Sequence, residues 1–176
     1  CDVSLYADDT CIYYSSKTPV DIECKLNNDL AHISHWLSCN RLALNRKKCE
    51  AMLIGSQKRI KGKDINVFID NVRISPVTEC KYLGVHIDNS LDWDKHVEYL
   101  CKCTLKNMYL LKRIRHCISQ ETALLFYKTI AQSKLDYCDV VWTNTKKQNV
   151  QKLQILQNRL LKTVTKVETR YSTQLI

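Results

Sequence analysis

Two adjacent aspartates near the start of the chain, Asp8 and Asp9, are the residues whose type and spacing best suit chemistry. They lie in the stretch VSLYADDTCIYYS (residues 3–15), between runs of apolar, β-branched and aromatic residues. Such runs fit strands and aspartate fits turns, so we expect a strand, a tight turn that carries both carboxylates, and a second strand. Neighbouring carboxylates repel each other, and a Mg²⁺ ion would neutralise them because it binds one or two carboxylates together with substrate phosphates. The alternative is an ordinary solvated turn.

Length and composition predict a folded chain of one domain or two small ones. The 176 residues are 45% hydrophobic and 26% charged, with only three glycines and two prolines. No apolar run approaches the ~20 residues of a membrane-spanning helix, so we expect no membrane partner. The chain begins at Cys1, directly in a strand pattern. We therefore expect a fragment whose upstream strands are missing.

The ten cysteines predict neither a disulfide framework nor a zinc site. They are scattered, with no C-x-x-C pair and no secretory signal. We expect most of them to be buried small hydrophobic residues in an intracellular, reducing compartment, in the nucleus, the cytoplasm or both. His32, His35 and Cys39 follow one predicted helix, but they lack a fourth ligand, so an ordinary helix face is favoured over a metal site.

The first part of the chain predicts an α+β fold, an antiparallel sheet with one packed helix. The helix begins at Thr18-Pro19 and ends at Asn40, which we expect to be a left-handed cap. Residues 49–56 (CEAMLIGS) and 81–88 (KYLGVHID) are typical of strands. Alternating apolar residues on both sides of Asp70-Asn71 predict two further strands joined by a turn.

From residue 94 onward the hydrophobic period becomes helical, with apolar stripes along residues 97–111, 119–131 and 150–164. The segment LDYCDVVW (residues 135–142) interrupts this pattern. The net charge follows the same division. Residues 1–93 hold 12 basic and 12 acidic residues, and residues 94–176 hold 15 and 6. A basic helical part next to a neutral part indicates binding to a polyanion, although a lysine-rich solvated surface would give the same balance.

Four segments in order resemble the reverse transcriptases of non-LTR (LINE, jockey-like) retrotransposons. LYADDT (residues 5–10) is similar to their catalytic YxDD turn, and residues 35–55 are similar to the helix and strand that follow it. Residues 81–97 resemble their primer-grip hairpin, and residues 135–142 and 149–166 resemble their thumb. The resemblance implies that residues 1–93 are the C-terminal part of the palm and residues 94–176 a helical thumb.

The resemblance also implies the catalytic residues. Asp8 and Asp9 would bind two Mg²⁺ ions together with an aspartate from an upstream strand. Lys48 would position the nucleotide and protonate the departing pyrophosphate. Cys49 stands where threonine is usual, and Lys47 lies beside Lys48, so the assignment could shift by one residue or the lysines could be a solvated charge run.

The residues implied to bind primer and duplex fall into three groups. Tyr6 would lie beneath the primer terminus, unless it is an ordinary strand aromatic. Gly84 allows close backbone approach of another chain, or only marks a bulge. The full set is Tyr6, the primer-grip residues Tyr82, Leu83 and Gly84, and the thumb residues Lys152, Arg159 and Lys162. A separate basic loop is favoured as mobile and solvated, and it holds Lys58, Arg59, Lys61 and Lys63.

The implied function is that of an RNA-directed DNA polymerase, with an RNA template, a DNA primer and dNTPs as partners. The fingers and the N-terminal palm would lie upstream, so we expect this fragment to be inactive alone. Two alternatives stay open: a non-catalytic RNA-binding protein, maturase-like or from a decayed element, and a helical interaction domain with a solvated lysine surface.

Overall fold

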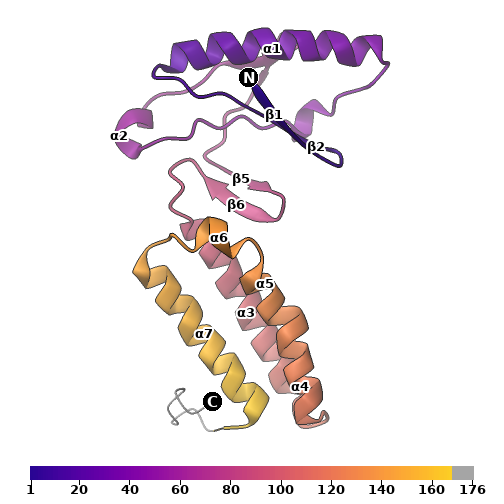
Figure 1. Ribbon diagram of the computed structural model, residues 1–176, viewed down its shortest axis with the longest axis vertical. Coiled ribbons are helices and arrows are strands. Elements are labelled where there is room, and N and C mark those ends of the chain that lie inside the picture. The colour runs from indigo at the N-terminus through magenta and orange to yellow at the C-terminus, as the bar shows by residue number, and fades with distance from the viewer. Residues whose placement is uncertain (168–176) are drawn as a thin grey trace. The chain divides into compact units, whose positions relative to one another are not determined.

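The computed structural model describes residues 1–167 (Figure 1). The chain divides into two compact units, one of Cys1–Cys80 and Asp88–Leu91, and one of Lys81–Ile87 and Asp92–Ile176. Helices occur together with small antiparallel sheets, which confirms the α+β class. The predicted second domain extends to residue 176, and residues 168–176 lie outside the described part. Within residues 1–167, no helix has both the length and the apolarity needed to cross a membrane.

The first unit opens with the predicted hairpin. Strand β1 (Asp2–Tyr6) pairs antiparallel with β2 (Asp9–Tyr13), and Tyr6 lies opposite Asp9. Ala7 and Asp8 therefore form a two-residue turn, in which Ala7 has a φ of +52°. Two-residue hairpin turns need a positive φ because only then does the turn match the right-handed twist of its strands. The predicted strand, turn and strand are confirmed, but the turn carries only Asp8, because Asp9 is the first residue of β2.

Helix α1 (Pro19–Cys39) begins as predicted, because the Thr18 side chain accepts a hydrogen bond from the Asp21 backbone N–H at 3.2 Å. Its predicted left-handed cap at Asn40 is wrong, since Asn40 has a φ of −89°. The next residue, Arg41, takes the left-handed conformation with a φ of +55°. The N–H of Leu42 bonds to the carbonyl of Leu37 at 2.9 Å, which completes a Schellman motif. Asn40 instead donates from its side chain to the Trp36 carbonyl.

The core of the first unit lies between α1 and a second hairpin, β3 (Val67–Ile69) and β4 (Val72–Ile74). Its buried residues are Leu30, Ile65, Val67 and Ile69. Asn27 on α1 caps the edge of β3 twice, since its side chain accepts from the Phe68 N–H and donates to the Asn66 carbonyl, both at 2.8 Å. These bonds satisfy backbone groups that would otherwise be left open at the strand edge.

Residues 49–56 do not form the predicted strand. Only Ala51 makes a bridge, parallel to Pro76, supported by a 2.8 Å hydrogen bond from the Val77 N–H to the Ala51 carbonyl. Pro76 has no N–H, so this pairing cannot extend into a regular ladder. Short helices flank this stretch, the 3-10 helix η1 (Arg46–Lys48) before it and α2 (Gln57–Ile60) after it. Strands in the described chain form three separate two-stranded pairs rather than one sheet.

The third strand pair is a hairpin, as the resemblance implied, whereas the strand pattern of residues 81–88 alone predicted a single strand. It consists of β5 (Glu79–Tyr82) and β6 (Val85–Asp88). Leu83 and Gly84 form its two-residue turn with φ values of +44° and +83°. Positive φ at both central residues is the type I′ pattern, for which Asn-Gly is the preferred pair.

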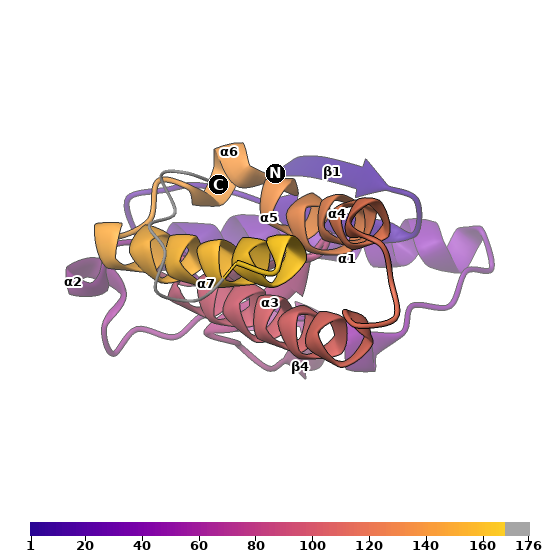
Figure 2. The same ribbon diagram turned by 90° about the horizontal axis from the view of Figure 1, so that it is seen from below.

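The second unit is helical beyond β6. Its long helices are α3 (Asp94–Ile114) and α7 (Lys147–Thr165), and α4 (Gln120–Phe126) continues through a π-helical segment η2 (Tyr127–Gln132) into α5 (Ser133–Asp136). The short helix α6 (Asp139–Trp142) follows. Figures 1 and 2 show α3, α4 and α7 side by side as a bundle. The predicted helical period from residue 94 is confirmed.

Two apolar clusters fill this unit. Leu111, Ala123 and Leu160 are fully buried where α3, α4 and α7 meet. Val85 of β6 joins the other cluster, so the hairpin is packed onto the helices of its own unit. That cluster consists of Val85, Trp93, Val97, Leu100, Leu135, Trp142 and Leu153.

The π-helical segment changes which residues face the core. The sequence pattern put Leu124, Tyr127, Ile130 and Ala131 on one buried stripe, but Leu124 and Ile130 are 40% and 39% exposed. Ile130 lies within the π-helical segment, where i to i+5 bonding rotates residues relative to a regular helix, whereas Leu124 lies before it in α4. Tyr127 and Ala131 remain buried, and the Tyr127 hydroxyl accepts from the Gln157 side chain at 2.8 Å.

Arg115 joins the end of α3 to the end of α7 inside the protein. It is 7% exposed, and its guanidinium donates to the carbonyls of Val164 (2.8 and 3.0 Å) and Ile118 (3.0 Å). The carbonyls at a helix C-terminus carry partial negative charge, which favours a cation there. Arg115 therefore caps α7 from a buried position.

His96 is buried in the first turn of α3 and is 1% exposed. Its Nδ1 accepts the backbone N–H of His86 at 3.3 Å, and its Nε2 has no partner among the described residues. The rings of Trp142 and Tyr99 lie beside it. Burial first, and the nearby charge of His86 second, lower the pKa of His96. The imidazole is therefore neutral in the folded protein at neutral pH.

We expect the second unit to lose stability as the pH falls below about 6.5. The pKa of His96 is lower in the folded state than its unfolded value of 6.5, so the unfolded chain takes up the proton first. The stabilisation is complete above pH 6.5 and declines below it. Urea unfolding between pH 7.5 and 5, followed by Trp93 and Trp142 fluorescence in a Trp36→Phe background, measures this slope. His96→Gln should flatten it and the exposed-site control His116→Gln should not; equal slopes in both variants would contradict the account.

Candidate active site

The turn between β1 and β2 presents both aspartates to solvent. Asp8 occupies the second turn position and Asp9 the first position of β2, and both are exposed. Tyr6 lies opposite Asp9 in the ladder, so its side chain shares a face of the hairpin with the Asp9 carboxylate. The structure thus brings together three of the predicted site residues: Tyr6, Asp8 and Asp9.

Ala7 holds the turn in a conformation that alanine rarely adopts. Its φ of +52° lies in the left-handed region, where a Cβ atom is unfavourable and glycine is preferred. Non-glycine residues persist there only when the surrounding structure fixes them, and they gather at functional sites. Ala7, the residue next to the two carboxylates, therefore adopts the unfavourable conformation of this turn.

The two carboxylates suit part of a divalent-metal site. Mg²⁺ commonly takes one or two carboxylates from a protein and completes its shell with water and substrate phosphates. Asp8 and Asp9 offer that number. Throughout residues 1–167, no group of three or more His, Cys, Asp or Glu side chains is arranged to hold a metal ion. On α1, the Cys39 sulfur lies 3.7 Å from His35 Nε2.

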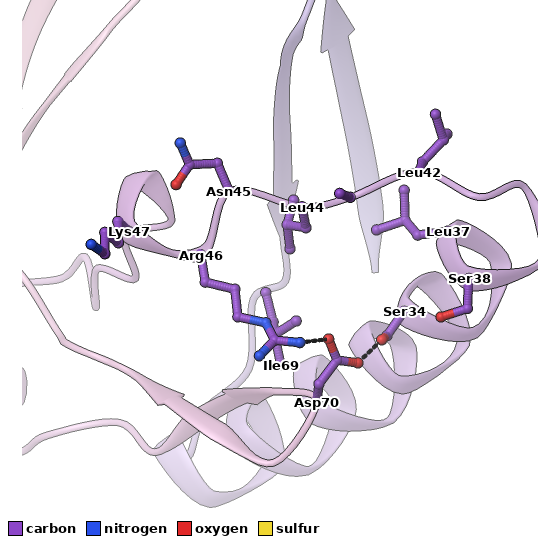
Figure 3. A pocket seen from close by; sticks show the side chains of 11 residues that line it. Ser34, Leu37, Ser38, Leu42, Leu44, Asn45, Arg46, Lys47, Ile69 and Asp70 are labelled. Carbon is purple, nitrogen blue, oxygen red and sulfur yellow. Dashed lines mark hydrogen bonds and ion pairs between the residues drawn. The ribbon is translucent and has the colours of Figure 1, made fainter.

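Lys48 is exposed at the end of η1, in a loop that is tied to its own unit by Arg46. The Arg46 guanidinium pairs with Asp70 in the β3–β4 turn, and Asp70 also accepts a hydrogen bond from Ser34 on α1 (Figure 3). Figure 3 shows these side chains converging at a cavity of about 440 Å³. Lys47 lines this cavity, whereas Lys48 does not. Within the described chain, no ion pair joins Lys48 to Asp8 or Asp9.

The primer-grip candidates Tyr82, Leu83 and Gly84 belong to the second unit. They lie in and beside the type I′ turn of the third hairpin. The Tyr82 hydroxyl oxygen is buried and has no hydrogen-bond partner in the described part of the chain. Gly84 is exposed, and an added Cβ there would meet the Tyr137 ring at 3.3 Å.

The predicted cations on α7 lie along one side of that helix. Lys152 and Arg159 are exposed and Lys162 is half-buried, while Leu153 and Leu160 are buried. Lys152, Arg159 and Lys166 recur every seven residues, so they form one stripe. Such a stripe offers charge without the amide and carboxylate groups that read bases, which suits contact with a phosphate backbone.

Sequence reasoning missed the lysines of α3 that extend this surface. Lys102 pairs with Glu98 at 3.0 Å, and this bond first, with smaller effects of Lys95 and Lys152, lowers the pKa of Glu98. Lysines from α3 and α7 therefore surround one carboxylate. We name Lys95, Lys102, Lys152 and Arg159 the α3–α7 basic surface. The seven-residue spacing of Lys95 and Lys102 was the available signal.

The cysteines differ from the prediction in their burial. Cys24, Cys39 and Cys117 are exposed and the other seven are partly buried, so the prediction that most would be buried is wrong. All ten are free thiols. Burial raises the pKa of Cys49, Cys80 and Cys101, which keeps these thiols protonated at neutral pH.

Residues 1–87 match the family described as reverse transcriptase (RNA-dependent DNA polymerase). This part of the chain, with its hairpin that carries Asp8 and Asp9, is therefore similar to reverse transcriptases. No solved structure matches the chain significantly.

Similarity to proteins of mobile elements extends over nearly the whole chain. It is 25% identical to the probable RNA-directed DNA polymerase from transposon X-element of Drosophila melanogaster, over 95% of this chain and 19% of that protein. It is 24% identical to the RNA-directed DNA polymerase from mobile element jockey of Drosophila funebris, over 92% of this chain and 18% of that protein. The chain thus spans about a fifth of these relatives. The resemblance to polymerases of jockey-like non-LTR elements is confirmed.

The strained turn gives a test with a defined sign. Ala7→Gly should slow amide exchange along β2 by about 2- to 5-fold, because glycine adopts a positive φ without the steric cost that alanine bears. Ala31→Gly, on an exposed face in the middle of α1, should do the opposite and speed exchange in α1, because glycine weakens a helix by about 1 kcal/mol. Hydrogen exchange by NMR measures both. Faster exchange in β2 of Ala7→Gly would show that Ala7 is not strained.

Proposed function

We propose that the chain is part of an RNA-directed DNA polymerase of a non-LTR retrotransposon, which copies RNA into DNA by two-metal nucleotidyl transfer. The observation that carries the proposal is the Ala7–Asp8 turn, which exposes two adjacent carboxylates inside a segment that matches the reverse transcriptase family. The names of the relatives, RNA-directed DNA polymerases of mobile elements, support the same activity.

In this proposal Asp8 and Asp9 are the metal ligands of this segment, and the ions are Mg²⁺. Bound there, the ions would activate the primer 3′-hydroxyl and stabilise the in-line displacement of pyrophosphate from the α-phosphate of the incoming dNTP. Tyr6 shares a face with Asp9 and would support the primer terminus. Lys48 would contribute a positive charge near the departing pyrophosphate.

The second unit would hold the template–primer duplex. An RNA–DNA hybrid offers phosphates and shape rather than a readable major groove, so a cationic surface without base-reading groups suits it. The α3–α7 basic surface with Lys162 would bind the duplex backbone, and Tyr82, Leu83 and Gly84 would contact the primer. In these roles residues 1–93 act as the C-terminal palm and residues 94–176 as the thumb.

We also propose that these 176 residues do not polymerise alone. The chain spans 18–19% of its relatives, and two carboxylates in one turn would hold a metal pair poorly without a further ligand. The ten free thiols fit an intracellular, reducing setting, in the nucleus, the cytoplasm or both.

A second candidate function is RNA binding without catalysis. The α3–α7 basic surface favours it, because this surface is independent of Asp8 and Asp9 and could persist in a maturase-like or decayed protein. Primer extension by the complete protein separates the two functions. Extension supports the polymerase, and duplex binding without extension supports the binding protein.

Asp8→Asn in the complete polymerase should lower primer extension on an RNA template by more than about 100-fold, the scale of losing one group that stabilises the transition state. Duplex affinity should stay nearly unchanged, because the substitution removes a metal ligand and leaves the basic surface intact. Asp2→Asn, an exposed aspartate on the same hairpin, is the matched control and should keep full activity. A parallel loss of duplex binding in Asp8→Asn would assign Asp8 a structural role instead.

Lys152→Gln with Arg159→Gln should weaken binding of the 176-residue chain to an RNA–DNA hybrid and make it less sensitive to salt. Each lost phosphate contact lowers the slope of log K against log salt by about 0.7–0.9, so the pair should lower it by about 1.5. Fluorescence anisotropy between 50 and 300 mM KCl measures the slope. Lys58→Gln with Lys61→Gln, in the basic loop of the first unit, is the charge-matched control. An equal decrease for both pairs would mean that net charge alone, and not this surface, governs binding.

A further inference from the structure

One segment of the second unit has no role in the proposed function, the LDYCDVVW stretch that contains α6. Its Tyr137 lies against the turn of the third hairpin. The Tyr137 hydroxyl donates to the Leu83 carbonyl at 2.7 Å. The ring also contacts Gly84 closely, since an added Cβ there would meet the ring at 3.3 Å. Tyr137 therefore contacts both central residues of the turn.

The turn needs such support because Leu83 is poorly suited to its first central position. A type I′ turn requires a positive φ at both central positions, and Leu83 has a φ of +44°. A bulky side chain at positive φ is a genuine conformational outlier, which persists only where surrounding structure fixes it. Tyr137 supplies that structure through the Leu83 carbonyl, and Gly84 leaves room for its ring.

Tyr137 is itself held firmly. The Trp142 indole donates to the Tyr137 carbonyl at 3.0 Å, and Trp142 is 4% exposed in the core cluster that also contains Val85 of β6. Cys138, with a φ of +51°, turns the chain from α5 into α6 directly after Tyr137. The Tyr137 side chain is 49% exposed, so burial of apolar surface does not account for its place.

We propose that Tyr137 is a positioning residue that fixes the Leu83–Gly84 turn in the orientation in which it binds the primer strand. The inference rests on the proposed function, which assigns primer contact to this turn. Tyr137 acts through the backbone of Leu83 and does not touch the primer. The ring covers one side of Gly84, and the lack of a side chain on Gly84 allows close approach of a nucleic acid backbone.

The first test measures the turn itself, without reference to catalysis. In the 176-residue chain, Tyr137→Phe should speed amide exchange of Gly84 and Val85 by about 3- to 10-fold, the effect of one lost hydrogen bond. The amides of α3 should keep their protection, which shows that the unit is still folded. Tyr109→Phe, a 62% exposed tyrosine on α3, is the matched control.

A rescue variant separates positioning from general stability. Leu83→Asn changes the turn to Asn-Gly, the pair that type I′ turns prefer, so the turn should hold without the Tyr137 hydroxyl. Tyr137→Phe with Leu83→Asn should therefore regain the protection of Gly84 and Val85. Unchanged exchange in Tyr137→Phe, or no recovery in the double variant, would overturn the positioning role.

The second test uses the complete polymerase. Tyr137→Phe should raise the KM for primer–template by about 3- to 10-fold, with a smaller change in kcat, and Tyr109→Phe should change neither. Faster amide exchange in the turn with an unchanged KM for primer–template would overturn the proposal. Tyr137 would then hold the turn, but the turn would not bind primer. If the unsubstituted polymerase did not extend a primer, that result would contradict the proposed function. The hydrogen-exchange result would be unaffected.

Discussion

Short antiparallel hairpins closed by two-residue turns impose positive φ values on whichever residues occupy the turns, and three such turns organise this protein. They contain Ala7, the pair Asp70-Asn71, and the pair Leu83-Gly84. The first carries the aspartate pair, the second anchors Arg46 in the loop that leads to Lys48, and the third is the proposed primer contact. Only one of these turns contains a glycine. Arg46 and Ser34 bind Asp70 in the second turn, and Tyr137 binds Leu83 in the third, so packing around these two turns fixes their conformations.

The charge of the chain is distributed to match this arrangement. The unit with the aspartate turn is close to neutral, so its two carboxylates are a local feature that a divalent cation can neutralise. The helical unit carries lysines from two helices around the single carboxylate Glu98. Its interior is mostly apolar. The buried Arg115 guanidinium donates hydrogen bonds to the Val164 carbonyl at the end of α7. The lysines of this unit thus lie on its surface, whereas the buried charge of Arg115 is satisfied inside it.

The spacing of hydrophobic residues allowed helical and strand regions to be predicted, because this spacing follows which residues of an element are buried. The strands around Asp70-Asn71 and the helices after residue 94 followed from this periodicity, the first hairpin followed from its residue types, and the start of α1 followed from Thr18-Pro19. The sequence could not predict features that depend on partners distant in the chain. Residues 49–56 look like a strand but have only Pro76 as a limited partner. The π-helical segment, which contains the partly exposed Ile130, has no signature in the apolar spacing. Within the candidate site, the aspartate pair was predictable from residue type, whereas the contact of Tyr137 with Leu83 joins residues 54 positions apart and required the structure.

Paramagnetic NMR can determine whether the turn of Asp8 and Asp9 binds a divalent cation. Mn²⁺ would be titrated into the isotopically labelled 176-residue chain, since it takes the same oxygen ligands as Mg²⁺ and broadens nearby resonances. The account predicts that broadening begins at the amides of residues 6–10 and disappears when both aspartates are replaced by asparagine. Broadening that begins at other acidic residues, or that is unchanged by the double replacement, would contradict it.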